Sequence, residues 1–220
     1  MNADRAPQLK ASVMRLRHME EMYLRKWEDL LAKLKVAGSD TLPTEEEILA
    51  FEKATKIALP TGFKEYCLVF GSGLLSDEFR ICCPCRINGQ WDLLDYGNFS
   101  LDAYKEAVKF EIEHGLAGHP ALDLKRMKVL KAILNNSLPF ADNRNAELFL
   151  WHLDSFSAMD NNYDIYRVPL DDLEQSALVG RDFFQFVSEF IYGTKVNDIL
   201  PRDYQYPRLQ KTFYRAAESD

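Results

Sequence analysis

Apolar residues near the start of the chain recur at three- and four-residue steps, the spacing that places side chains on one face of a helix. The stripe consists of Leu9, Val13, Leu16, Tyr23, Trp27, Leu30 and Leu34, and Gly38 follows it as a helix-ending residue. The pattern predicts one amphipathic helix over residues 8–36. Such a helix either packs on its own domain or forms an arm that binds a partner, and the spacing allows both.

The next segment begins with a strong local signal for a helix. In LPTEEEILAFEKA, Thr44 and Glu47 have the spacing of a capping box, in which each side chain accepts a hydrogen bond from the other residue's backbone N–H. The Leu-Pro pair at 59–60 then ends this helix and opens a short third one, TGFKEYCLVF, which Gly71 terminates.

Strand patterns come next. EFRICCPCRI (78–87) and QWDLLDY (90–96) flank Asn88-Gly89, the dipeptide typical of a tight hairpin turn. Pro84 cannot donate to a strand ladder and predicts an edge or a bulge in the first strand. Two helices are predicted after this hairpin, one capped by Ser100 and ending at Gly115, and one over LDLKRMKVLKAIL (122–134).

The last third of the body has the alternation of a three-stranded meander. Its strands are LPFAD (138–142), ELFLWHLDS (147–155) and YDIYRVPL (163–170), and DFFQFVSEFIYG (182–193) predicts a final helix. Helices, hairpin, helices, meander and helix in this order predict an α+β fold with an antiparallel sheet. With no internal repeat and no linker, we expect one domain over 39–193, an N-terminal helix within 1–38 that packs on it, and a C-terminal tail over 194–220.

Charge is uneven along the chain, and this limits the classes of partner. The net formal charge is −7. Residues 1–38 sum to +3, residues 39–193 to −11 and the remainder to +1. An acidic body repels phosphate, which argues against nucleic acid and leaves a basic protein as a fitting partner. We expect no membrane segment and no secretory signal, and therefore a cytoplasmic protein whose cysteines stay reduced.

Few residues have the arrangement that catalysis or metal binding needs. Cys82, Cys83 and Cys85 are nearly adjacent, whereas a structural zinc site uses two spaced pairs of ligands, so we expect no metal. Motifs for a nucleophile elbow, a phosphate loop, a dinucleotide site and a zinc protease are all missing from the sequence. We therefore expect no cofactor and no enzyme activity of the common kinds.

The remaining candidates lie in and around SLPFADNRNAELFLWHLDS (137–155). On a strand, His152 and Asp154 share a face and could form a general-base pair, which makes a small hydrolase the remote alternative. The polar residues between the two strands suit a hairpin bend, with a binding loop as an added role. The candidate partner-binding residues are Asp142, Asn143, Asn145 and Asp154, with Trp91 and Trp151 as aromatic anchors.

Three stretches together resemble the SUKH superfamily of Smi/Knr-type domains. Residues 45–73 match its opening signature at Ile48, Phe51, Glu52, Leu59, Pro60, Phe63, Lys64, Tyr66 and Gly71. LPFADNRNAELFLWHLDS resembles the central strand–turn–strand element, and DFFQFVSEF resembles the final helix. The family's turn usually contains a glycine where this chain has Asn145-Ala146, and we expect Asn145 to supply the left-handed backbone there.

The resemblance implies a curved antiparallel sheet flanked by helices, and protein binding in place of catalysis. It points first to a bacterial immunity protein that neutralises a toxin, for which a basic toxin domain would suit the acidic body. The alternative is an intracellular regulator or scaffold related to fungal cell-wall assembly proteins. The partner's identity and the oligomeric state are left open by the sequence.

Overall fold

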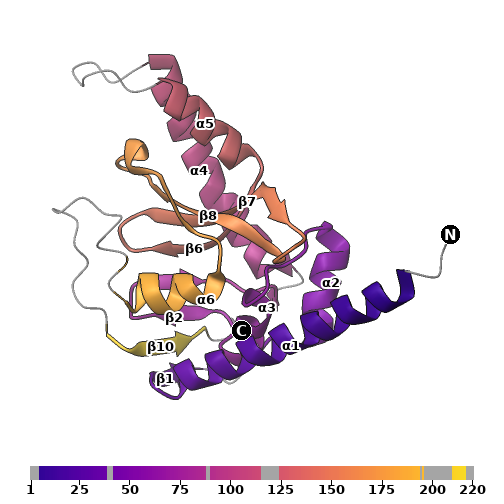
Figure 1. Cartoon of the computed structure of the whole chain (residues 1–220). Coiled ribbons are helices and arrows are strands. Elements are labelled where there is room, and N and C mark those ends of the chain that lie inside the picture. Colours follow the sequence, from indigo (N-terminus) through magenta and orange to yellow (C-terminus); the bar gives the residue numbers. More distant parts are fainter. Residues whose placement is uncertain are drawn as a thin grey trace.

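The computed structural model describes residues 5–38, 42–87, 90–114, 124–193, 195 and 210–216, and for 5–16 and 87 the backbone alone. Within these ranges the main element is an eight-stranded sheet, antiparallel except for its first pair (Figure 1). The strands in spatial order are β1 (Lys35–Gly38), β10 (Thr212–Arg215), β2 (Gly73–Leu75), β3 (Phe79–Ile81), β6 (Ser137–Asn143), β7 (Glu147–Ser157), β8 (Asn162–Pro169) and β9 (Ala177–Gly180).

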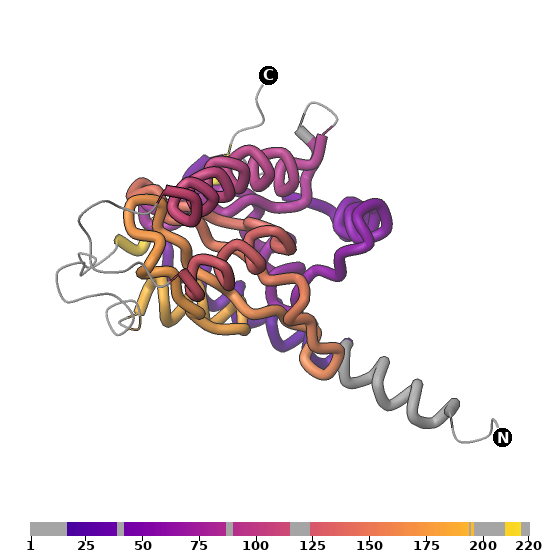
Figure 2. Tube along the Cα trace, turned by 90° about the horizontal axis from the view of Figure 1, so that it is seen from above, coloured from indigo at the N-terminus to yellow at the C-terminus, as the bar shows by residue number. Residues whose placement is uncertain are grey.

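Helices cover both faces of this sheet, which confirms the predicted α+β class. They are α1 (Arg5–Leu31), α2 (Glu45–Thr55), α3 (Phe63–Val69), α4 (Asp92–His114), α5 (Leu124–Asn135) and α6 (Phe183–Gln185), which continues into a π-helical segment (Phe186–Ile191). A short 3-10 turn, η1 (Leu173–Gln175), joins β8 to β9. Figure 2 shows α4 and α5 side by side along one face of the sheet.

Strand β7 shows how the alternating sequence builds two cores. Phe149 and Trp151 face a large aromatic core shared with α1, α2, α3 and α6. Leu148 and Leu150 face the opposite way, into a second core under α4 and α5. Neighbouring side chains of a strand point to opposite faces, so this run of apolar residues belongs to a central strand covered on both sides.

Helix α1 is joined firmly to the aromatic core. Trp27 is fully buried, its ring lies edge-on to Tyr66 and Phe70, and its indole N–H donates to the carbonyl of Gly62 at 2.7 Å. Beyond α1 the chain enters β1, which pairs in parallel with β10. The predicted helix over 8–36 is therefore too long at its C-terminal end, because residues 35–38 belong to the sheet.

The close pairing of β10 with β2 depends on a glycine. A Cβ atom added at Gly73 would lie 2.4 Å from the carbonyl oxygen of Tyr214 and 2.5 Å from the ring of Phe213. Both distances are shorter than any real contact, so only glycine lets the two strands approach this closely.

Three predictions about residues 78–115 are wrong in detail. QWDLLDY is a strand only at Gln90–Trp91, and α4 begins at Asp92, so Ser100 lies inside a helix instead of capping one. The helix prevails because Leu93, Gly97 and Leu101 are all buried, at the four-residue steps of one helical face. The predicted first strand is divided between β3 and β4 (Arg86–Ile87) on either side of Pro84. The predicted hairpin partners do pair, because β4 is antiparallel to β5 (Gln90–Trp91), and the Asn88-Gly89 turn between them lies outside the described residues.

The meander and the start of α2 follow the predictions. Strands β6, β7 and β8 pair in antiparallel order, and Thr44 caps α2 with the expected capping box to Glu47. The tail is described only at 195 and 210–216, where β10 forms part of the sheet.

Candidate functional site

The predicted residue Asp142 lies at the centre of a polar group near the β6–β7 turn. Its carboxylate accepts a hydrogen bond from the hydroxyl of Tyr96 on α4. Arg80 is its cross-strand partner on β3, and the Arg80 guanidinium lies 4.2 Å from the centre of the Tyr96 ring. Three different elements therefore hold this acid, base and phenol together.

Burial makes the acidic residues of this group harder to ionise. Loss of hydration raises the pKa of Asp142, although the Tyr96 hydrogen bond and the Arg80 charge act in the opposite direction. Burial likewise raises the pKa of Asp92, which accepts a 3.0 Å hydrogen bond from Ser72. The pKa of Tyr96 is also raised, chiefly by burial and then by its bond to Asp142.

Two surface hollows meet at Asp142 and Asn143. One, of about 630 Å³, is lined by Phe99, Asp102, Tyr104 and Leu170 among others. The other, of about 590 Å³, contains Asp92, Arg144 and Arg215 among its lining residues. The turn that the sequence singled out thus contributes to the lining of both hollows.

An acidic stripe on α4 borders the first hollow. Asp95, Phe99, Asp102 and Glu106 recur at helical steps and are all exposed, with 82% of Phe99 accessible to solvent. We call these four residues together with Asp142 the acidic shelf. Asp95 and Asp102 flank the Phe99 ring, and Glu106, one turn beyond Asp102, pairs with Lys109 at 3.3 Å. An exposed aromatic ring flanked by carboxylates is suited to contact a basic protein surface.

The polar turn itself is held by Asn143, which is buried. Its side-chain oxygen accepts from the backbone N–H of Asn145 and of Glu147, each at 3.0 Å, and its amide donates to Glu147 at 2.6 Å. Asn143 is thus a structural turn residue, whereas Asn145 is exposed. The left-handed backbone, predicted for Asn145, occurs at Ala146 instead, with φ of 54°.

The other candidate residues are not brought to the shelf. Trp151 is fully buried between Phe63 and Phe140, so it cannot anchor a partner on the surface of the folded chain. Trp91 packs edge-on against Phe51 of α2, with the Arg86 guanidinium over its ring. Asp154 is exposed at the far part of β7, where it bonds to Asn136.

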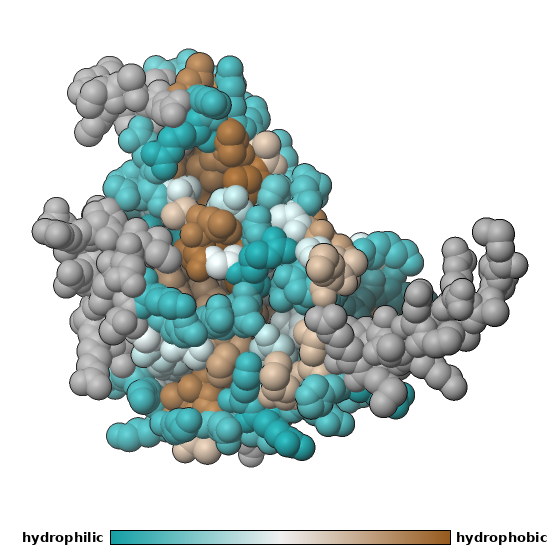
Figure 3. All heavy atoms as spheres, viewed as in Figure 1, coloured by the Kyte–Doolittle hydropathy of each residue, from teal (hydrophilic) through white to brown (hydrophobic). Residues whose placement is uncertain are grey.

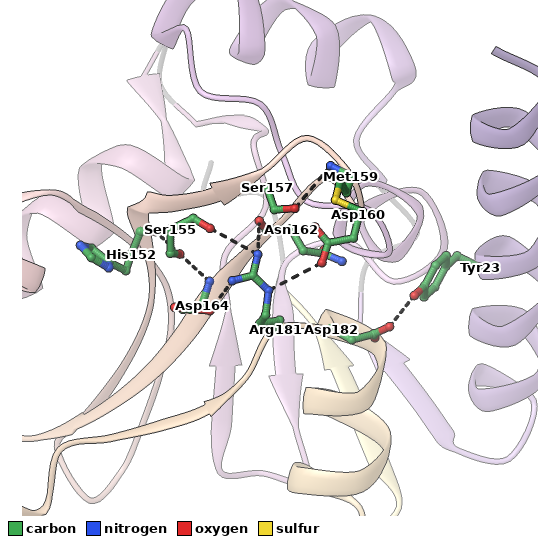
Figure 4. Close-up of polar contacts among 10 residues, drawn as sticks. All are labelled: Tyr23, His152, Ser155, Ser157, Met159, Asp160, Asn162, Asp164, Arg181 and Asp182. Carbon is green, nitrogen blue, oxygen red and sulfur yellow. Dashed lines mark hydrogen bonds and ion pairs between the residues drawn. The ribbon is translucent and has the colours of Figure 1, made fainter. Parts of the chain in front are cut away.

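His152 and Asp154 share a face as predicted, but they do not make a tight pair. The His152 Nε2 and the Asp154 Oδ2 are 3.6 Å apart, longer than a hydrogen bond, and Asp154 is 66% exposed. The hollows at Asp142 are lined by other residues. In Figure 4 the His152 ring points away from the polar contacts that surround Arg181.

Arg181 organises the irregular end of the β7–β8 hairpin. Its guanidinium pairs with Asp164 and, at 3.6 Å, with Asp160, and it donates to the carbonyls of Ser155 and Asn162 (Figure 4). These groups come from both strands of the hairpin, so one cation fixes the bend. Nothing in the local sequence pattern indicated this role, because the contacts span up to 26 residues.

The cysteines have the properties of packed core residues. Cys67, Cys82 and Cys83 are buried, and burial raises the pKa of the partly buried Cys85 to about 11. Thiols in this state are protonated and unreactive near neutral pH. Within the described part of the chain, no group of three or more His, Cys, Asp or Glu residues is placed to hold a metal ion, and no helix there is long and apolar enough to cross a membrane.

Sequence reasoning found Asp142 but missed most of the shelf. The strand predicted over 90–96 gave no reason to place Tyr96 beside Asp142. The cap predicted at Ser100 placed Phe99 outside the helix, so it was not seen to share a face with Asp102. A continuous helical reading of 92–114 would have placed Asp95, Phe99, Asp102 and Glu106 on one face.

Comparison with known protein families gives one match. The model of the SMI1 / KNR4 family (SUKH-1) matches residues 42–189, about two thirds of the chain. The match runs from the residues before α2 into the π-helical segment, and so includes the shelf and the turn. Searches of curated proteins and of solved structures gave no significant match.

Proposed function

Because the chain belongs to the SMI1/KNR4 (SUKH-1) family, we propose that it is a non-catalytic protein-interaction domain that neutralises a toxin in the cytoplasm as an immunity protein. Its partner is a basic toxin domain, and its contact surface is the acidic shelf. The single observation that carries this proposal is the exposed stripe of three carboxylates around Phe99, beside the hollow at Asp142.

The chemistry of the shelf supports a basic partner. Asp95, Asp102 and Glu106 are exposed, and the 39–193 segment that carries them has a net charge of −11. Opposite fields speed the encounter of two proteins and exclude partners of like charge. Phe99 supplies apolar area at the centre of the stripe, where a contact can exclude water.

The arrangement of the titratable groups supports a role without catalysis. The His152–Asp154 separation of 3.6 Å and the exposure of Asp154 do not favour a general-base pair. The partly buried acids Asp92 and Asp142 are each tied to a hydroxyl of the protein itself. These contacts stabilise the fold around the shelf.

The test co-expresses the chain with each candidate toxin domain found among the genes that neighbour its own. We expect restored growth and a nanomolar complex that weakens as salt is raised. Asp95→Lys/Asp102→Lys should weaken the complex by about 100-fold and abolish protection. Glu21→Lys/Glu28→Lys on α1 makes the same change in charge at the same spacing and should leave both unchanged.

Three outcomes would overturn parts of this proposal. Equal losses in the two charge variants would show a general effect of net charge, with no contact at the shelf. Full-strength binding by the shelf variant would place the interface elsewhere. Absence of protection, with binding to a regulatory protein of the host cell instead, would replace the immunity role by the regulator alternative.

A further inference from the structure

Helix α5 differs in charge from the rest of the acidic body. Its twelve residues, LKRMKVLKAILN, include four cations and no acid. Lys125, Arg126, Lys128 and Lys131 are all exposed. The exposed side of this helix therefore carries a cluster of positive charges on a chain whose net charge is −7.

The same helix forms one wall of an apolar groove of about 360 Å³. Arg126, Val129 and Ile133 of α5, Tyr166 of β8, and Leu173 and Glu174 at η1 are among the residues that line it. Val129 is 53% exposed, and Figure 3 shows apolar atoms gathered in the region of α5 with hydrophilic ones around them. Arg126, Val129 and Ile133 are spaced by three and four residues, so a cation and two apolar side chains face the groove from one side of the helix.

We propose that this groove binds an acidic amphipathic helix of a partner protein, at a site separate from the acidic shelf and of opposite charge. The apolar face of the incoming helix would cover Val129, which is 53% exposed, and the small accessible parts of Ile133 and Leu173, which are each 7% exposed and otherwise belong to the core. Its carboxylates would lie beside Arg126 and within the field of Lys128 and Lys131. This is helix-in-groove recognition, in which apolar anchors at helical spacing give affinity and flanking charges give orientation.

The lining favours this occupant over the other polyanions. A nucleic acid would satisfy the cations but would leave the apolar residues without a matching surface. An anionic membrane offers both charge and an apolar region, but it is a broad surface, whereas the apolar residues line a groove between α5 and η1 that a single helix can enter. A basic segment would be repelled by four cations on one helix. Among the described residues that line the groove, Glu174 on the opposite wall is the acid, and it favours an occupant that keeps its carboxylates on the α5 side.

The experiment uses the full chain and a fluorescein-labelled 18-residue peptide with leucines on one helical face and glutamates on the other. We expect saturable binding in the micromolar range, measured by fluorescence anisotropy at 0.15 M salt. Arg126→Glu/Lys128→Glu should weaken binding about tenfold, and Val129→Ser several-fold. Arg25→Glu/Lys53→Glu, an exposed arginine and lysine on α1 and α2, is the matched control and should bind like the wild type. Thermal unfolding checks that each variant is folded.

Further probes decide between occupants. A peptide of the same composition with its leucines scattered around the helix should bind at least tenfold more weakly, and equal binding would overturn the proposal by showing charge attraction alone. A 20-nucleotide single strand, or vesicles of phosphatidylcholine with phosphatidylserine, that displaced the peptide from the groove at lower concentration would also overturn it. So would a dimer in sedimentation velocity that Val129→Ser abolishes, because a second copy would then occupy the groove. The outcome does not depend on the immunity role, since no toxin is used.

Discussion

Loss of the Glu147 carboxylate should destabilise the folded chain strongly, although only one side chain is changed, because its partner is a buried charge. Glu147 on β7 and Arg167 on β8 form an ion pair whose side chains are only 6% and 4% exposed. The Arg167 Nε donates to Glu147 at 2.8 Å, a second guanidinium N–H donates to the same oxygen, and Asn143 donates to the other at 2.6 Å. The pair therefore joins two strands to the turn beside the shelf.

Glu147→Ala leaves the Arg167 charge buried without its carboxylate. Removing one member of such a pair costs about 3–5 kcal/mol, a large fraction of the roughly 5–15 kcal/mol that stabilises a typical domain. Glu147→Leu/Arg167→Met removes both charges at similar volume, so the cost that remains, about 1–3 kcal/mol, comes from loss of the Asn143 hydrogen bond to Glu147. The double variant should thus be more stable than the single one.

Urea unfolding followed by tryptophan fluorescence would measure these differences, because Trp27 and Trp151 are both fully buried. The slope of each transition checks that the variants unfold in one step. A loss below about 1 kcal/mol for Glu147→Ala would refute the reasoning, since it would mean that water reaches Arg167 in the native state. A double variant as unstable as the single one would refute the claim that the unpaired charge carries the cost.

Four further changes to the chain have expected effects on its stability that can be measured. Trp27→Ala should lower the free energy of unfolding by about 3–5 kcal/mol in the same urea assay, because it leaves a cavity in the aromatic core and removes the hydrogen bond to Gly62. Deletion of residues 1–38 removes the same contacts, so the remaining chain should be unfolded when measured by circular dichroism. Gly73→Ala should cost roughly 2–4 kcal/mol and lower the melting temperature, since the new Cβ meets the Tyr214 carbonyl at 2.4 Å, and a melting temperature within a degree of wild type would contradict the strand pairing. Burial raises the pKa of Asp142, so its contribution to stability is full below the ordinary aspartate pKa and is lost as pH rises through the raised value. The stability of the wild type should therefore fall as pH rises from about 4, and Asp142→Asn should make this fall smaller. Part of the fall should remain in the variant, because the pKa values of Asp92 and Glu65 are also raised. A pH profile of stability that is the same in the variant and the wild type would contradict the effect of burial on Asp142.

Elements with a complete local pattern were predictable from the sequence. Strands β6 to β8 alternate over many residues, and the Thr44 capping box contains both of its partners within four positions. The start of α4 was not predictable in this way, because Leu93 and Tyr96 fit a strand as well as a helix. Packing decides the matter, since Gly97 lies against Pro139 of β6, with 3.1 Å from an added Cβ to the Pro139 carbonyl oxygen.

In the candidate site, too, residues were predictable only where the evidence for them lies in a short stretch of sequence. Asp142 could be found from its own turn. Tyr96 and Arg80, which complete its surroundings, come from segments 46 and 62 residues away in the sequence. Trp151 was predicted to lie at the surface but is buried. An aromatic residue near a polar turn can belong to an interface or to the core, and only the pairing of β7 with its neighbouring strands decides between them.

The positions of β1 and β10 have a consequence for how this family unit is isolated. Both strands lie outside the matched residues 42–189, yet β10 covers the outer side of β2, and β1 covers β10. A chain trimmed to the family boundaries would leave β2 as an open edge, with unpaired backbone groups and the apolar Leu75 next to it. Open edges of this kind pair with other molecules and aggregate. The flanking segments thus protect the solubility of the family unit, although they carry none of its signature.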